Sequence, residues 1–191
     1  MTKTNKIRPT PRAIDLFSGC GGLSLGLKQA GFRVIAAIEI DPTATDSYEA
    51  NHGKGIVRQA DIRSVSARGL MRTLRLCPGQ LELLAGCPPC QGFSTLRTRN
   101  GAKRNRDRRN DLVGEMLRFA RAFRPKAVMM ENVPTLEGRK PFVDLCNGLR
   151  RLGYKVTHKV KEAVALMIGN ALPPELIRRQ ALQISTALRE H

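Results

Sequence analysis

Residues 12–41 of this 191-residue chain read RAIDLFSGCGGLSLGLKQAGFRVIAAIEID. The apolar run over 12–17 predicts a buried strand, and the glycines after it predict a tight turn into a helix. In that helix, apolar side chains recur at the expected spacing: Leu23, Leu27 and Ala30. The run over 32–39 predicts a second buried strand, so the stretch is a strand–turn–helix–strand unit.

The same alternation continues along the chain. Further strands are predicted over 81–86 and 127–130. Further helices are predicted over 41–51, 112–123, 142–153 and from 173 onward. Strands that alternate with helices are typical of a parallel sheet covered on both faces. We therefore expect an α/β fold with a mostly parallel, doubly wound sheet, in one domain over residues 1–191. Ligands of such sheets bind beyond the carboxyl ends of the strands.

The chain is strongly basic. Lys and Arg number 33 against 16 Asp and Glu, which gives a formal net charge of +17. A field of this sign attracts polyanions, and nucleic acid is the first candidate, with an arginine-rich protein from a GC-rich genome as the plainer alternative. The longest apolar stretch, 163–168, is far shorter than the roughly 20 residues of a membrane span, and the basic N-terminus lacks an apolar signal core. We expect a cytoplasmic protein with no membrane partner.

Five cysteines stand at irregular spacing, which argues against a disulfide scaffold. Cys87 and Cys90 follow the strand predicted over 81–86, where three chemistries are open: a redox dithiol, half of a zinc site, or a single nucleophile. Zinc would need two more ligands, and the sequence holds no second CxxC pair, so we expect no metal. The segment after Cys90 is too polar and basic to continue a packed helix, which disfavours the dithiol.

Two further groups of residues follow predicted strands. The glycines at 19, 21 and 22 permit close approach of a ligand to the backbone, and Glu39 ends the second strand, where a carboxylate can accept hydrogen bonds from a ribose. Together they favour a cofactor that contains a nucleoside, although Glu39 could equally be a solvated capping acid. Glu131 ends the strand over 127–130, and desolvation there would raise its pKa and let it give a proton near neutral pH. Capping of a helix, or pairing with one of the many arginines, is the structural alternative for Glu131.

Several blocks of the sequence resemble the motifs of the DNA (cytosine-5)-methyltransferase family. In the order of that family they are DLFSGCGGLSLG (15–26), EID (39–41), CPPCQGFS (87–94), ENVP (131–134) and IGNALPP (168–174). Two shorter blocks, ADI (60–62) and RRNDL (108–112), fit as well. The glycine loop alone is unspecific, whereas PPCQGFS followed by ENVP is strongly specific. The resemblance implies a Rossmann-like, S-adenosylmethionine-dependent methyltransferase fold.

The resemblance also implies a reaction. Cytosine C5 is too weakly nucleophilic to take a methyl group unaided, but a thiolate that adds at C6 turns the ring into an enamine whose C5 can attack the methyl group of S-adenosylmethionine. Cys90, which precedes Gln91, would be that nucleophile, Glu131 would protonate or hydrogen-bond N3, and Asn132 would help to hold the loop. The target base must leave the duplex to reach Cys90. On this interpretation Cys87 is incidental.

A larger set of residues takes binding roles by the same resemblance. The cofactor pocket would be lined by Phe17, Ser18, Gly19, Gly21, Leu23, Glu39, Ile40, Asp61, Ile62, Pro89, Leu112, Asn170 and Ala171. Glu39 would hold the ribose, and Asp61 the adenine amino group. DNA would be contacted by Gln91, Gly92 and Ser94, and by the basic run that holds Arg97, Arg99, Lys103, Arg104 and Arg106. The charge of that run predicts an arm that grips phosphates, with a solvated surface loop as the plainer alternative. DNA is the expected partner, RNA is not excluded, and a bacterial-type protein bound to DNA would be nucleoid-associated.

One part of the family pattern is missing. Only residues 135–168 separate ENVP from GNALPP, and they hold neither the Gln-x-Arg-x-Arg motif nor a target-recognition domain. The chain reads as if an internal stretch had been removed near 160–161. Three interpretations remain open: a cytosine-5 methyltransferase, impaired or dependent on a partner chain that supplies target recognition; an inactive S-adenosylmethionine- and DNA-binding remnant or subunit; and a dithiol oxidoreductase that uses Cys87 and Cys90.

Overall fold

A computed structural model describes residues 9–89, 112–131, 136, 138–157 and 174–190. Its centre is one sheet in the order β3-β2-β1-β4-β5, and every neighbouring pair is parallel. The strands are β1 (Arg12–Leu16), β2 (Arg33–Glu39), β3 (Val57–Gln59), β4 (Leu83–Gly86) and β5 (Ala127–Met130). Parallel strands place their carboxyl ends at one edge of the sheet, so the residues that follow β1, β2, β4 and β5 are brought together.

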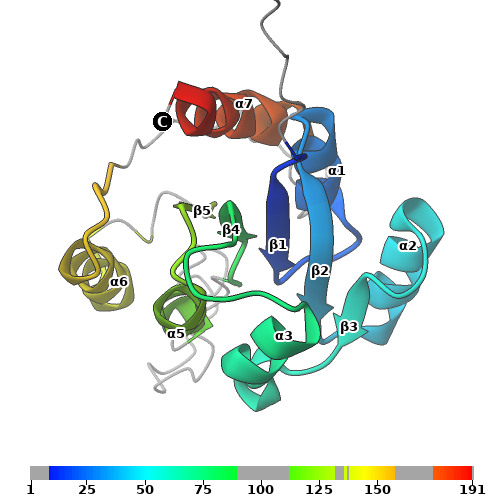
Figure 1. Cartoon of the computed structure of the whole chain (residues 1–191). Helices are drawn as coiled ribbons and strands as arrows, with labels where there is room; N and C mark the ends of the chain where they lie inside the picture. Colours follow the sequence, from blue (N-terminus) through cyan, green and yellow to red (C-terminus); the bar gives the residue numbers. More distant parts are fainter. Residues whose placement is uncertain (1–8, 90–111, 132–135, 137, 158–173, 191) are drawn as a thin grey trace, which may run out of the picture.

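The helices connect these strands and cover both faces of the sheet (Figure 1). They are α1 (Gly22–Gln29), α2 (Pro42–His52), α3 (Ala67–Thr73), α5 (Leu112–Phe123), α6 (Lys140–Arg151) and α7 (Pro174–Glu190), with a short 3-10 helix η1 (Ile62–Ser64). Helix α2 begins where the sequence dictates: the Asp41 side chain accepts a hydrogen bond from the Ala44 N–H, and Pro42 occupies the first turn.

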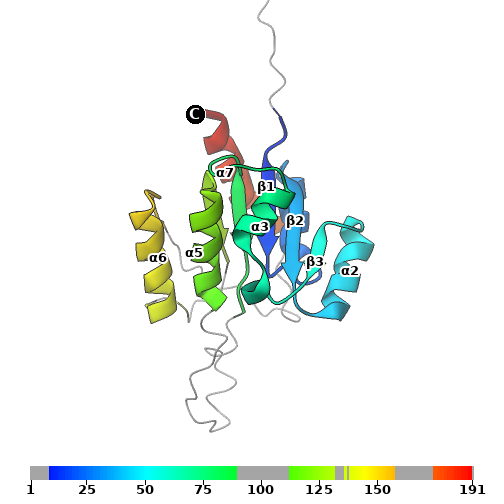
Figure 2. The same cartoon turned by 60° about the horizontal axis from the view of Figure 1, so that its bottom comes forward.

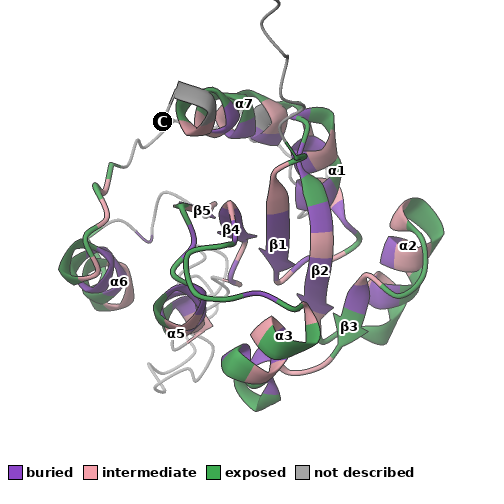
Figure 3. Cartoon of the chain, viewed as in Figure 1, coloured by how far each residue is buried: buried purple, intermediate pink, exposed green. Residues whose placement is uncertain are grey.

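Two apolar layers hold the sheet. On one face, α1 and α7 pack together and bury Leu27, Ile177 and Ala181 against β1 and β4. On the other face, α3 and α5 pack against the sheet with Met116 and Phe119 at the centre, and α6 packs on α5 (Figure 2). The inner faces of the helices are buried and their outer faces exposed, as Figure 3 shows. The two layers together fix the strand ends in place.

The close approach of α1 and α7 depends on a glycine. A Cβ added at Gly26 would lie 2.5 Å from Ile177 Cβ and 2.6 Å from the Pro174 carbonyl oxygen. Both distances are shorter than real Cβ contacts, so only glycine lets the two helices meet at this spacing.

The predicted α/β fold with a parallel, doubly wound sheet is confirmed. The strand over 127–130 and the helix over 112–123 have the predicted bounds, and the other predicted elements within the described residues shift by up to two residues. Strand β3 and helix α3 were not predicted, because β3 has three residues and α3 seven, too few for an apolar period to stand out. The predicted junction near 160–161 lies outside the described residues.

Candidate functional site

The site is built at the carboxyl ends of four adjacent strands. Backbone hydrogen bonds continue past the sheet: the Cys87 N–H donates to the Leu16 carbonyl at 3.2 Å, and the Glu131 N–H donates to the Gly86 carbonyl at 3.1 Å. Ser18 N–H donates to the Ile38 carbonyl at 3.0 Å in the same way. The glycine loop, Glu39, Cys87 and Glu131 therefore meet at one edge, as the sequence predicts.

The glycine loop runs from Phe17 to Gly22 in an unusual backbone conformation. Phe17, Gly19 and Gly21 have φ values of 62°, 53° and 98°. A non-glycine residue in this left-handed region costs roughly 1–3 kcal/mol, and such residues cluster at ligand-binding sites. The loop opens α1, whose N-cap residue Gly21 provides no side-chain cap, and the N-terminus of a helix favours a polar or anionic ligand. Among the described residues, no heavy atom lies within 4 Å of where Gly19 would carry a Cβ.

Glu39 holds the glycine loop from β2. One carboxylate oxygen accepts the Gly19 N–H at 2.7 Å, and the other accepts the N–H groups of Ile40 and Asp41, each at 2.9 Å. Each oxygen has more than one acceptor site, so a hydroxyl group of a ligand can still donate to this carboxylate. Ile40 beside it is 60% exposed, and it offers an apolar surface to a planar ring next to the carboxylate. Both residues lie at the carboxyl end of β2, and their role in cofactor binding stays a prediction.

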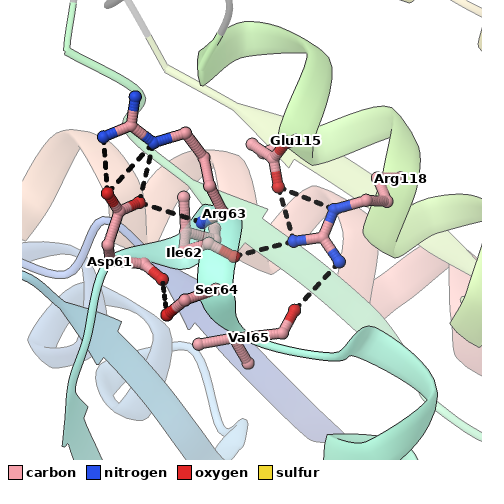
Figure 4. A network of polar contacts seen from close by, with 7 residues as sticks. All are labelled: Asp61, Ile62, Arg63, Ser64, Val65, Glu115 and Arg118. Atoms are coloured by element: carbon pink, nitrogen blue, oxygen red, sulfur yellow. Dashed lines mark hydrogen bonds and ion pairs between the residues drawn. The ribbon is translucent and has the colours of Figure 1, made fainter.

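Asp61 is bound to a neighbouring arginine. Its side chain accepts hydrogen bonds from the backbone and guanidinium of Arg63, which lower the pKa of the carboxyl (Figure 4). Arg118 of α5 donates to the carbonyl oxygens of Ile62 and Val65 at 2.7 and 2.9 Å and ties α5 to η1. An adenine amino group would therefore have to share the Asp61 carboxylate with Arg63.

The remaining predicted cofactor residues divide into two groups. Leu23 and Ile62 are buried in the core, whereas Leu112 and Pro89 are half-buried. Asn170 and Ala171 lie outside the described residues, as do Cys90, Asn132 and the predicted DNA contacts Gln91, Gly92, Ser94, Arg97, Arg99, Lys103, Arg104 and Arg106.

A buried polar network lies beneath the loop. Asp15 is fully buried in β1, and burial raises the pKa of its carboxyl to about 7. Its Oδ2 accepts a hydrogen bond from the Ser24 hydroxyl at 2.6 Å, and Ser24 Oγ lies 2.8 Å from the Tyr48 hydroxyl. Asp15 Oδ1 and Ser18 Oγ are buried and find no partner among the described residues. Unsatisfied polar atoms here fit a site that a polar ligand completes.

Cys87 and Glu131 form a pair of acidic groups at the ends of β4 and β5. Burial raises the pKa of the Glu131 carboxyl, as the sequence predicts, and a hydrogen bond from the Cys87 thiol opposes that rise. Burial also raises the pKa of the Cys87 thiol well above its ordinary value, and the charges of Asp15 and Glu131 add to the effect. Cys87 is therefore a protonated donor to Glu131 and a poor nucleophile, because the thiolate is the reactive form.

The sequence prediction missed the network members Asp15, Ser24 and Tyr48, and it treated Cys87 as incidental. The signal for Asp15 was available, since a carboxylate inside an otherwise apolar strand is costly unless it has a partner. Asp15 pairs with Ser24 of α1, which in turn pairs with Tyr48 of α2, and the spacing of these residues in the sequence gives no hint that they meet.

Two features are absent from the described part of the chain. No helix in it is long and apolar enough to cross a membrane. No group of three or more His, Cys, Asp or Glu side chains in the same part could hold a metal ion.

Comparison with known proteins gives a consistent result. The model of the family described as C-5 cytosine-specific DNA methylase matches residues 12–166. The Type II methyltransferase M1.HphI of Haemophilus parahaemolyticus is 39% identical over 153 residues, which is 78% of this chain and 40% of the relative. The Type II methyltransferase M.AgeI of Thalassovita gelatinovora is 36% identical over 146 residues, 75% of this chain and 33% of the relative.

The fold agrees as well. The solved structure of the methyltransferase EhMeth of Entamoeba histolytica superposes with a TM-score of 0.59 at 22% identity, over 75% of this chain and 44% of that chain. The chain thus spans 33% and 40% of the two curated relatives, M.AgeI and M1.HphI. The family match, the parallel sheet and the shared edge of the glycine loop, Glu39 and Glu131 lead to one conclusion: the chain belongs to the C-5 cytosine-specific DNA methylases, a family of S-adenosylmethionine-dependent methyltransferases.

Proposed function

We propose that this chain binds S-adenosylmethionine and carries the catalytic residues for methylation of cytosine C5 in DNA. The observation that carries the proposal is the position of Glu131. Its carboxyl group is half-buried, its pKa is raised, and it shares one sheet edge with the glycine loop and Glu39. A proton donor beside a cofactor loop is what activation of a pyrimidine ring requires.

The residues around the glycine loop fit the cofactor. Glu39 offers one remaining acceptor position for a ribose hydroxyl, Ile40 offers an apolar surface for the adenine, and the space at Gly19 lets a ligand approach the backbone. The unsatisfied oxygens of Asp15 and Ser18 suit the polar end of such a ligand. When bound, S-adenosylmethionine supplies an electrophilic methyl group.

The protein groups act on the target base. The Cys90 thiolate adds to C6 of an extruded cytosine, so that a sulfur–carbon bond forms and the electrons of the C5–C6 double bond move toward C5. Glu131 gives its proton to N3 at the same time and becomes a carboxylate. After C5 is methylated, water takes the C5 proton, the sulfur–carbon bond breaks, and the N3 proton returns to Glu131.

The basic segment that follows Cys90 would hold DNA phosphates, through Arg97, Arg99, Lys103, Arg104 and Arg106. Gln91, Gly92 and Ser94 would lie nearest the extruded base. A target-recognition part would come from a partner chain, and without it we expect weak or absent sequence-specific methylation. The support is the short spacing between ENVP and GNALPP, residues 135–168, which lacks the Gln-x-Arg-x-Arg motif.

Three measurements test the proposal. Calorimetry with S-adenosylmethionine tests cofactor binding. Transfer of a radiolabelled methyl group to duplex DNA, with RNA as a parallel substrate and Cys90→Ser as control, tests the reaction. DNA that contains 5-fluorocytosine should become covalently attached to Cys90, because fluorine at C5 cannot leave as the C5 proton does and the sulfur–carbon bond therefore stays. Binding without adduct or transfer would favour the second candidate, an inactive S-adenosylmethionine- and DNA-binding subunit.

The dithiol alternative makes a different prediction. It requires Cys87 for activity, whereas the methyltransferase proposal expects Cys87→Ser to be tolerated because a hydroxyl also donates to Glu131. The raised pKa of the Cys87 thiol, caused by burial, speaks against the dithiol.

A further inference from the structure

His52, the last residue of α2, lies against the back of the glycine loop. Its Nε2 is 2.9 Å from the Gly21 carbonyl oxygen, and its Nδ1 is 3.0 Å from Lys28 Nζ. Its ring centroid is 4.6 Å from that of Tyr48, one turn earlier in α2. The imidazole therefore bridges the glycine loop and the last turn of α1.

These two contacts fix the tautomer of His52. A lysine ammonium group has only donors, so Nδ1 must accept from Lys28 and cannot carry a proton. The proton of the neutral ring is then on Nε2, where it is donated to the Gly21 carbonyl. Burial and the charge of Lys28 both lower the pKa of His52, in agreement with a neutral ring.

Gly21 is shaped for this contact. Its φ of 98° is in the left-handed region, and a Cβ added there would lie 2.2 Å from His52 Nε2. The imidazole thus occupies the space that a side chain at position 21 would fill. Glycine at position 21 therefore allows both the left-handed backbone conformation and the close contact with His52.

The glycine loop is held at two points by residues near the two ends of α2. Glu39, just before α2, accepts the Gly19 N–H at 2.7 Å, and His52 at the end of α2 meets the Gly21 carbonyl at 2.9 Å. Between them, the Ser24 and Tyr48 hydroxyls pair α1 with α2 at 2.8 Å. These contacts restrict the backbone of the loop before a ligand binds. Preorganisation of this kind raises affinity, because less conformational entropy is lost on binding.

We propose that His52, held as its Nε2–H tautomer by Lys28, is a positioning residue that keeps the glycine loop in its cofactor-binding conformation. Cofactor affinity then depends on a side chain that the cofactor does not touch. This inference rests on the proposed binding of S-adenosylmethionine at the loop.

The test is calorimetric titration of S-adenosylmethionine into the whole chain and into variants. His52→Ala removes the hydrogen bond to Gly21 and should weaken binding about tenfold, the effect of one lost hydrogen bond. His52→Gln places an amide N–H where Nε2 lies and should restore most of the affinity. Lys28→Met should weaken binding less than His52→Ala, and Lys54→Met, an exposed lysine just beyond α2, is its matched control.

Two measurements separate positioning from packing alone. Thermal unfolding reports stability, and His52→Gln should restore affinity even where it does not restore the melting temperature. The ¹⁵N chemical shifts of the imidazole should show a protonated Nε2 and an unprotonated Nδ1 in the wild-type protein.

The failures of the two proposals are distinguishable. If the wild-type chain binds S-adenosylmethionine and His52→Ala binds it equally well, the role of His52 is refuted and the proposed function stands. A protonated Nδ1 would refute the bridging arrangement in the same way. If the wild-type chain does not bind S-adenosylmethionine at all, the proposed function fails and this inference falls with it.

Discussion

Asp15 makes the stability of this protein depend on pH in an unusual direction. Desolvation raises the pKa of this fully buried carboxyl from 3.8 to about 7, while its hydrogen bond with Ser24 opposes the rise. The unfolded chain therefore releases the proton near pH 3.8, and the folded protein releases it only near pH 7. The contribution of the protonated carboxyl to stability is fully present below the lower value and is lost as the pH rises to the higher one.

The size of the loss follows from the two pKa values. The difference between 3.8 and about 7, at about 1.36 kcal/mol per pKa unit, gives roughly 4 kcal/mol as an upper limit. Asp15→Asn keeps the shape of the side chain but cannot ionise, so it should be as stable as the wild-type protein at low pH. Near neutral pH it should be more stable, by up to about 4 kcal/mol.

The assay is urea unfolding of both proteins at about pH 4.5, 6 and 7.5, and the quantity of interest is the difference between their free energies of unfolding. Taking the difference cancels the other carboxylates of the chain. Asp46→Asn, on the exposed surface of α2, controls for the loss of one negative charge from a basic protein. A difference between wild type and Asp15→Asn that stays constant over this pH range would refute the reasoning.

Three further changes test the packing and the site. Gly26→Ala should destabilise the protein by about 1–3 kcal/mol, because α1 and α7 must separate to admit the methyl group. The control Gly114→Ala has open space at its Cβ and should be neutral or stabilise the protein by up to ~1 kcal/mol. Chemical unfolding that ranks the two variants the other way would contradict the packing argument. Arg118→Lys keeps the charge but loses the planar guanidinium that donates to the carbonyl oxygens of Ile62 and Val65. The free energy of unfolding, measured in the same way, should fall by about 1–3 kcal/mol. An unchanged free energy of unfolding would mean that these contacts do not stabilise the protein. Cys87→Val removes the donor to Glu131 and should raise the pKa of that carboxyl further, so the pH profile of 5-fluorocytosine adduct formation should move to higher pH. Cys87→Ser keeps a donor and should leave the profile near its wild-type position. Equal profiles for the two variants would exclude the hydrogen bond as the cause.

Most strands, and the site residues that directly follow them, were predictable because they depend on local features of the sequence. The apolar runs of β1, β2, β4 and β5 stand out from their polar flanks, and the glycine loop and Glu39 follow directly from the ends of two of them. The raised pKa of Glu131 was predictable too, since it needs only an apolar strand before the carboxyl and the burial that comes with it.

The rest depends on contacts between distant parts of the chain. Asp15, Ser24 and Tyr48 belong to a strand and two helices, and their network exists only once α1 and α2 lie side by side. The hydrogen bond between Cys87 and Glu131 likewise requires β4 and β5 to be neighbours and to end together. No period or motif in the sequence encodes either meeting.

The packing of α7 on α1 has a consequence for how such proteins diversify. Helix α7 packs on α1 through Gly26, which admits no side chain, so helices from distant parts of the sequence together cover one face of the sheet. We therefore expect a change in the length of the segment between α6 and α7 to leave the contact of α7 with α1 intact, and an engineer would insert a new recognition segment there.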